Sequence, residues 1–143
     1  MNHSKLILRL GCTGVLIGTG GLLIYAAHHH QPMQELYLKD DSERRSYLAQ
    51  WGQTAAEEPP VQSEAILPEG GTSSVYETYC ALQEAQHLPL SQYAGQEAVI
   101  WTYTLTCSAS ARAELICTPD GLLLGAMCYD CTRFDRMYAL ITE

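Results

Sequence analysis

The sequence predicts an α+β protein in which an N-terminal transmembrane helix precedes a small domain with helices packed on an antiparallel β-meander. Three observations lead to this class. An uncharged apolar run of eighteen residues lies close to the N-terminus. Two stretches with apolar residues at helical spacing follow it, and three stretches with two-residue alternation fill the C-terminal half. About 115 residues remain after the apolar run, which is enough for one domain with a modest core.

The apolar run, residues 10–27, is the predicted signal anchor. It carries no charge, and Lys5 and Arg9 stand just before it. A membrane helix needs about 20 mostly apolar residues, and basic flanking residues stay in the cytoplasm. Residues 1–9 are therefore expected in the cytoplasm and the following domain outside it. The alternative is a secretory signal peptide cleaved near residues 24–26. The five glycines favour cleavage, whereas the length exceeds the usual apolar core of about 7–15 residues.

Glycines along the anchor suggest a further role. Gly14 and Gly18 stand four residues apart on one helical face, a spacing that lets two membrane helices approach closely. Glycine is also common in membrane helices that do not associate. Self-association through Gly14 and Gly18 is therefore one possibility beside a plain anchor.

The folded domain is expected to begin after a juxtamembrane linker of residues 28–41 and to extend over residues 42–143. Its first helix is predicted over residues 42–51, with Asp41 or Ser42 as the N-cap. Gly52 follows and ends this helix, since glycine is typical just beyond a helical C-terminus.

A polar linker at residues 53–62 and a short edge strand at 61–67 come next, before a second helix over residues 73–86 that Ser73 or Ser74 can cap. A stripe along this helix is expected to face the core. Its members are Val75, Tyr79, Leu82 and Gln86, with Tyr76, Cys80 and Gln83 beside them.

The meander itself is predicted from the change to two-residue alternation. Its three strands cover residues 97–107, 112–118 and 122–129. Residues 108–110 and 119–121 supply the turns, the second of them Pro-Asp-Gly. The tail, residues 134–141, fits either a short helix or a last strand.

Trp101 is predicted at the centre of the inward face of the first long strand. Alternation places it on one side of that strand with Val99, Tyr103 and Leu105. The simplest packing lays the second helix across this face. Trp101 is then buried, and its loss should largely prevent folding.

Several short patterns along the domain, taken together in this order, resemble a known family. They are Arg44-Arg45 with Leu48-x-x-Trp51-Gly52, the segments Tyr76 to Gln83 and Leu90 to Gly95, Tyr103-Thr104, and Gly125 before Cys128. The domain of residues 42–140 is similar in these positions to domain of unknown function 4830. The resemblance implies a short membrane segment and a small α+β domain in a Gram-positive bacterium. The activity of that family is not established, so the resemblance assigns no catalytic residue.

The chain departs from this family at positions that could carry a site. Cys80 and Cys107 stand where the family tends to have Asn. Residues 125–127 read Gly-Ala-Met in place of Gly-Gly-Asp. If those polar residues form a site in relatives, this chain lacks it or uses it differently.

The predicted domain contains five cysteines, Cys80, Cys107, Cys117, Cys128 and Cys131. In an oxidising compartment four of them could pair in about fifteen ways and leave one thiol. Cys107 and Cys128 are expected two strands apart, about 10 Å, which is beyond bridging reach. Cys128 and Cys131 should point to opposite faces of a straight strand, so they can bridge only if the chain turns at residues 129–130.

Charge and motifs narrow the function by elimination. Six basic residues stand against all sixteen acidic ones after residue 9, which disfavours binding of nucleic acid. The domain has one histidine, His87, and carries no recognised catalytic motif. The expectation is a single-pass membrane protein that is not an enzyme, has no cofactor or metal, and binds or assembles with a protein at the cell surface. The alternative is a redox or metal-handling protein that uses the Cys-x-x-Cys of Cys128 and Cys131.

Overall fold

The computed structural model describes residues 35–70 and 73–140. The predicted anchor, residues 10–27, lies outside these residues, as do Gly14 and Gly18. Their proposed roles therefore stay predictions. Within the described ranges, no helix is both long and apolar enough to cross a membrane.

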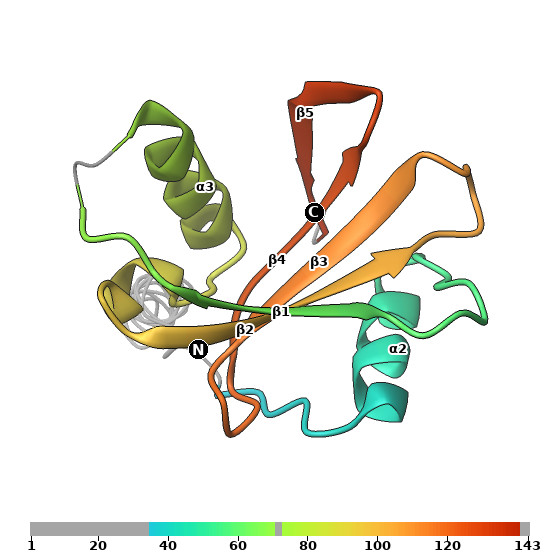
Figure 1. The fold of residues 1–143 in the computed structure, drawn as a ribbon, viewed down its shortest axis with the longest axis horizontal. Helices are drawn as coiled ribbons and strands as arrows, with labels where there is room; N and C mark the ends of the chain where they lie inside the picture. The colour runs from blue at the N-terminus through green and yellow to red at the C-terminus, as the bar shows by residue number, and fades with distance from the viewer. Residues whose placement is uncertain (1–34, 71–72, 141–143) are drawn as a thin grey trace, which may run out of the picture. The chain divides into compact units, whose positions relative to one another are not determined.

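A five-stranded antiparallel sheet forms the centre of the domain, with its strands side by side in chain order (Figure 1). The strands are β1 (Val61–Ile66), β2 (Glu97–Thr104), β3 (Ala111–Cys117), β4 (Leu123–Asp130) and β5 (Arg133–Ala139). The prediction of a small α+β domain with an antiparallel sheet is thus confirmed, and the tail forms the last strand. The turn before β4 requires Gly121, whose φ of +97° is costly for any residue with a side chain.

Two α-helices and one 3-10 turn complete the described domain. Helix α2 (Asp41–Gln50) starts after Asp40, whose carboxylate caps the Glu43 N–H in a reciprocal capping box. Helix α3 (Ser74–Ala85) is capped by Ser73, and η1 (Leu90–Tyr93) follows it. The sequence predicts both α-helices to within one residue at each end, although the α2 cap lies one residue earlier than expected.

The two helices lie on opposite sides of the sheet, as Figure 1 shows. On the α2 face the buried cluster includes Tyr47, Leu48, Tyr103, Leu105, Ala113, Leu115, Cys117, Leu123 and Ala126. On the α3 face it includes Leu67, Leu90, Ala98, Ile116, Leu122, Leu124 and Met127. β3 and β4 contribute apolar side chains to both clusters, so the sheet needs a covering helix on each side.

The prediction that the second helix covers the face of Trp101 is wrong. Helix α3 packs on the opposite face, and α2 occupies the face of Tyr103. The predicted stripe is also rotated, because Val75 is 64 % exposed whereas Gln83 is fully buried. Since the first five residues of β4 are buried on both sides of the sheet, alternation alone does not specify which helix covers which face.

Trp101 is only half-buried and does not lie at the centre of the core. It packs at the margin of the α2-face cluster, opposite Gln62 of the edge strand β1. The guanidinium of Arg44 packs on its indole ring, where an α3 side chain was expected. The expectation of a centrally buried Trp101 is therefore also wrong.

Two buried glutamines complete the edge of β4 where β5 does not reach. β5 pairs with β4 from Met127 onward. Before that point the Ala126 N–H donates to Gln83 Oε1 at 2.8 Å, and the Ala126 carbonyl accepts from Gln86 Nε2 at 2.9 Å. A side chain at Gly125 would lie 3.3 Å from Gln83. The amides thus act as a short substitute strand on a buried edge.

Candidate functional site

Arg44 is the one charged side chain among the buried residues of the described domain, at 5 % exposure. Helix α2 places it against the sheet because positions 44, 47 and 48 share one helical face, on which Tyr47 and Leu48 are also buried. The centre of the guanidinium lies 3.7 Å from the centroid of the Trp101 ring. The pair forms a close cation–π stack at the margin of the sheet.

Hydrogen bonds fix two of the three nitrogens of Arg44. Nε donates to the Tyr103 hydroxyl at 2.9 Å, and Nη1 donates to the Leu38 carbonyl at 3.3 Å. Both acceptors are uncharged oxygens. Nη2 has no acceptor among the described residues.

Tyr103 links Arg44 to a second charged pair. Its hydroxyl donates to Asp41 Oδ1 at 2.7 Å, while Asp41 Oδ2 accepts from Arg45 Nε at 2.7 Å. Burial favours the protonated form of Asp41. Hydrogen bonds from Arg45 and Tyr103, and the charges of both arginines, outweigh that effect and lower the pKa of Asp41. Burial and then Asp41 raise the pKa of Tyr103 to about 12, so its phenol stays a donor.

Arg45, the next residue, has a fully structural role. Its Nη1 donates to the Ala56 carbonyl at 2.6 Å and its Nη2 donates to the Glu58 carbonyl at 2.9 Å. Together with the ion pair to Asp41, these bonds use all three nitrogens. Arg45 therefore holds the segment before β1 against α2, whereas Arg44 keeps one donor unused.

Arg44 lines a hollow of about 330 Å³ on the α2 face, which we call the Arg44 hollow. Its other walls come from β1, β2, the chain before α2 and the β3–β4 turn. They are Leu38, Lys39, Gln62, Val99, Trp101, Thr118, Pro119, Asp120 and Gly121. A second hollow of about 350 Å³, the Glu64 hollow, adjoins it at Val99 and Pro119, which line both.

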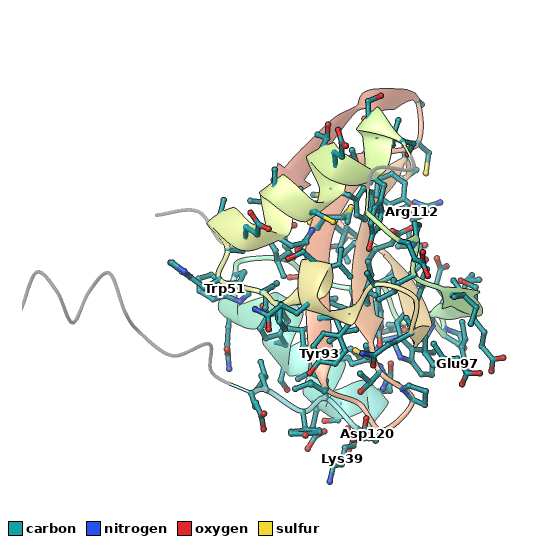
Figure 2. The ribbon with its side chains drawn as sticks, turned by 90° about the vertical axis from the view of Figure 1, so that its left-hand side faces the viewer. Lys39, Trp51, Tyr93, Glu97, Arg112 and Asp120 are labelled. Carbon is teal, nitrogen blue, oxygen red and sulfur yellow. The ribbon has the colours of Figure 1, made fainter. Side chains whose placement is uncertain are left out.

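The walls of the two hollows differ in their charged residues. Lys39 and Arg44 line the first, together with Asp120. Glu64 and Glu97 line the second. Figure 2 shows Lys39 beside Asp120 at the lower end of the domain, with Glu97 well apart from them. Trp101 and Glu97 are four residues apart on β2, which is about 13 Å of strand.

The outer edge of β1 is open along its whole length. No described residue pairs with it on the side away from β2, and Val61 and Ile66 are 67 % and 62 % exposed. The Leu67 N–H bonds toward β2, to the Gln96 carbonyl at 2.9 Å. Because the bonding direction alternates along a strand, the N–H groups of Gln62, Glu64 and Ile66 point outward.

All five cysteines of the domain are free thiols, and the described chain does not bring them to one site. Cys80 lies on α3 and Cys107 is exposed after β2. Burial raises the pKa of Cys117 to about 12. Burial, followed by the charge of Cys107, raises the pKa of Cys128 to about 11. Cys131 occupies the turn before β5.

The two cysteines of the Cys-x-x-Cys pair lie at and just beyond the end of β4. Cys128 packs against the α2-face cluster, and Cys131 lies in the turn before β5. The chain turns at residues 131–132, because Asp130 still pairs with Arg133. Among the described residues, no group of three or more His, Cys, Asp or Glu side chains is placed to hold a metal ion.

A second polar cluster on the α3 face has its charges satisfied. Glu114 accepts from the Tyr79 hydroxyl at 2.7 Å and from the Tyr129 hydroxyl at 3.1 Å. Burial and the charge of Glu114 raise the pKa of both phenols, that of Tyr129 to about 12. The phenols therefore remain donors at physiological pH. This cluster ties α3 to β3 and β4.

Sequence reasoning missed the Arg44 hollow. The available signal is an arginine that shares a helical face with Tyr47 and Leu48, whereas in the sequence Arg44 stands out only as part of a family pattern. The opposing walls, Trp101 and Pro119, come from other elements, so only the folded chain brings them to Arg44.

Comparisons with protein-family models, with curated proteins and with solved structures find no match to this chain. The resemblance to domain of unknown function 4830 therefore stays a prediction. Function has to be inferred from the geometry of the chain's own residues.

Proposed function

We propose that this protein is a binding module at the membrane surface. Residues 10–27 anchor it, and its acidic domain lies outside the cytoplasm. The domain takes up an extended segment of a partner protein along the outer edge of β1. The open edge of β1 is the observation that carries this proposal.

Proteins generally protect their edge strands because unpaired N–H and C=O groups invite another strand. β1 has neither Pro nor Lys among its six residues, and one charge, Glu64. Its end residues Val61 and Ile66 add exposed apolar surface. Such an edge suits strand addition, in which main-chain hydrogen bonds give affinity and alternate side chains give specificity.

Charge favours a basic partner segment. Glu64 lies within β1, Glu97 pairs opposite Ile66, and Glu57 and Glu58 precede the strand. The described ranges carry fifteen acidic and six basic side chains. A second copy of this acidic chain would be repelled, whereas an extended segment with Lys or Arg among apolar residues would be attracted.

The test uses the full chain in detergent micelles with an eight-residue peptide of alternating Val and Lys as the probe. Amide hydrogen exchange is followed at Gln62, Glu64 and Ile66. Binding should slow exchange at these outward amides, because each gains an acceptor. Glu64→Pro removes one outward donor at an edge position that tolerates proline, so it should weaken peptide binding.

Glu64→Gln is the matched variant. It removes the same charge as the proline substitution but keeps the N–H, so it should bind the peptide more tightly than Glu64→Pro. If peptide leaves the exchange rate of each of the three amides unchanged, the proposal of strand addition at β1 is wrong. Equal binding by the proline and glutamine variants would contradict it as well.

A further inference from the structure

A buried arginine without a bonded carboxylate is the starting observation. In the described parts of the chain, the ion pair on this helix joins Arg45 to Asp41 and leaves out Arg44. Arg44 is nonetheless 5 % exposed and bonded to two neutral oxygens. Buried charges are normally paired, because the loss of hydration is costly. The stack on Trp101 and the nearby charge of Asp41, which Tyr103 links to Arg44, offset part of that cost.

The unused donor of Arg44 belongs to a residue that lines an open space. Nη2 has no acceptor among the described residues, and the Arg44 hollow measures about 330 Å³. That volume is near the lower end for small-ligand sites, which begin at about 300 Å³. Gln62 adds an amide to the wall, and Lys39 lines it as well, with its ammonium 5.7 Å from the centroid of the Tyr37 ring. An anionic group placed there would give Arg44 its missing partner.

A carboxylate fits this hollow better than a phosphate. The carboxylate of Asp120 lines the same wall, and the domain as a whole is acidic. Both features act more strongly against a doubly charged anion than against a singly charged one. Trp101 and Val99 supply apolar walls that suit an organic ligand.

The adjoining Glu64 hollow defines the other end of the ligand. Glu64 and Glu97 would attract a cation, at about 13 Å of strand from Trp101. An extended peptide of about four residues spans that distance. We propose that the Arg44 hollow binds the C-terminal carboxylate of a short extended peptide, whose amino group lies near Glu64 and Glu97. This site lies on the α2 face and does not depend on strand addition at the outer edge of β1.

The test measures binding of tetra-alanine to the full chain in detergent micelles by calorimetry, with the tryptophan fluorescence as a second readout. The C-terminal amide of the same peptide should bind at least about ten-fold more weakly, since it lacks the charge-assisted bond. N-terminal acetylation should weaken binding to the unmodified protein but have little further effect in Glu97→Gln.

Variants separate the site from general charge effects. Arg44→Gln should abolish the preference for the acid over the amide. Lys39→Gln, on an exposed residue, should reduce that preference even if Arg44→Gln fails to fold. Arg112→Gln, which removes an arginine from β3, should leave it unchanged. Equal affinity for acid and amide overturns the proposal, and so does an absence of tetra-alanine binding at millimolar concentration.

Discussion

At the scale of single residues, Arg44 and Arg45 are adjacent and carry the same charge but do different work. Arg45 bonds to one carboxylate and two carbonyls and so joins two segments. Arg44 lies over the Trp101 ring, and its Nη2 has no acceptor among the described residues. Lysine has neither the planar group nor the fork of donors, so it could not replace either residue without loss.

Trp101→Ala is expected to destabilise the domain without preventing folding. The ring is half-buried and its main specific contact is the stack on Arg44. We expect a loss of about 2–3 kcal/mol, below the ~3–5 kcal/mol typical of a fully buried Trp. Thermal melting followed by circular dichroism measures this loss.

Val75→Ala is the control, because its side chain is 64 % exposed on α3. Its free energy of unfolding should stay within about 0.5 kcal/mol of that of the unmodified protein, so its melting midpoint should hardly change. An unfolded Trp101→Ala variant would mean that the ring supports the core directly. An unchanged midpoint would mean that the stack on Arg44 adds no stability.

At the scale of elements, α2 is joined to the sheet by a polar contact as well as by Tyr47 and Leu48. Asp41 is the only carboxylate of α2 that receives both a guanidinium and a phenol in the described structure. Because the pKa of Asp41 is lowered in the folded state, this residue contributes stability at neutral pH. That contribution is lost as the pH falls through the folded-state pKa.

Asp41→Asn should therefore be less stable than the unmodified protein at pH 7. The difference should narrow as the pH drops below about 3.9, the ordinary Asp value, because protonation then removes the same charge from the unmodified protein. Melting curves recorded between pH 7 and pH 3 measure it. Glu84→Gln, on an exposed residue of α3, should show no such narrowing. A pH-independent difference would contradict the role assigned to the Asp41 charge.

The sequence predicts the elements well because their signals are local. Ser73 caps α3 as expected, and the Pro-Asp-Gly turn ends β3. The packing of α2 and α3 on particular faces is not a local property. The segment Leu122–Met127 is buried throughout, so both faces of the sheet accept a helix. The burial of Arg44 was not predicted for a related reason. A charged residue is expected at the surface, even on a helical face that packs on the core, unless its bonding partners are known.

At the scale of the whole molecule, the prediction concerns membrane topology. Lys5 and Arg9 precede the apolar run, and the acidic residues follow it. A reporter enzyme fused after Glu143 should therefore be active only outside the cytoplasm. Activity of the fused reporter inside the cytoplasm would contradict the proposed location of the domain. The same fusion at residue 9 should behave in the opposite way and serves as the control.

The two edge strands of the sheet differ in charge, and this difference affects how many partners one copy can bind. β1 carries one charge in six residues, whereas β5 carries three in its seven, and charged edge strands resist pairing. Part of β4 beside β5 is already closed by Gln83 and Gln86. If strand addition occurs at β1, each copy accepts one guest strand there, and the described residues offer no second edge strand of equally low charge. Complexes formed through β1 should therefore stop at one partner per copy instead of extending into fibres.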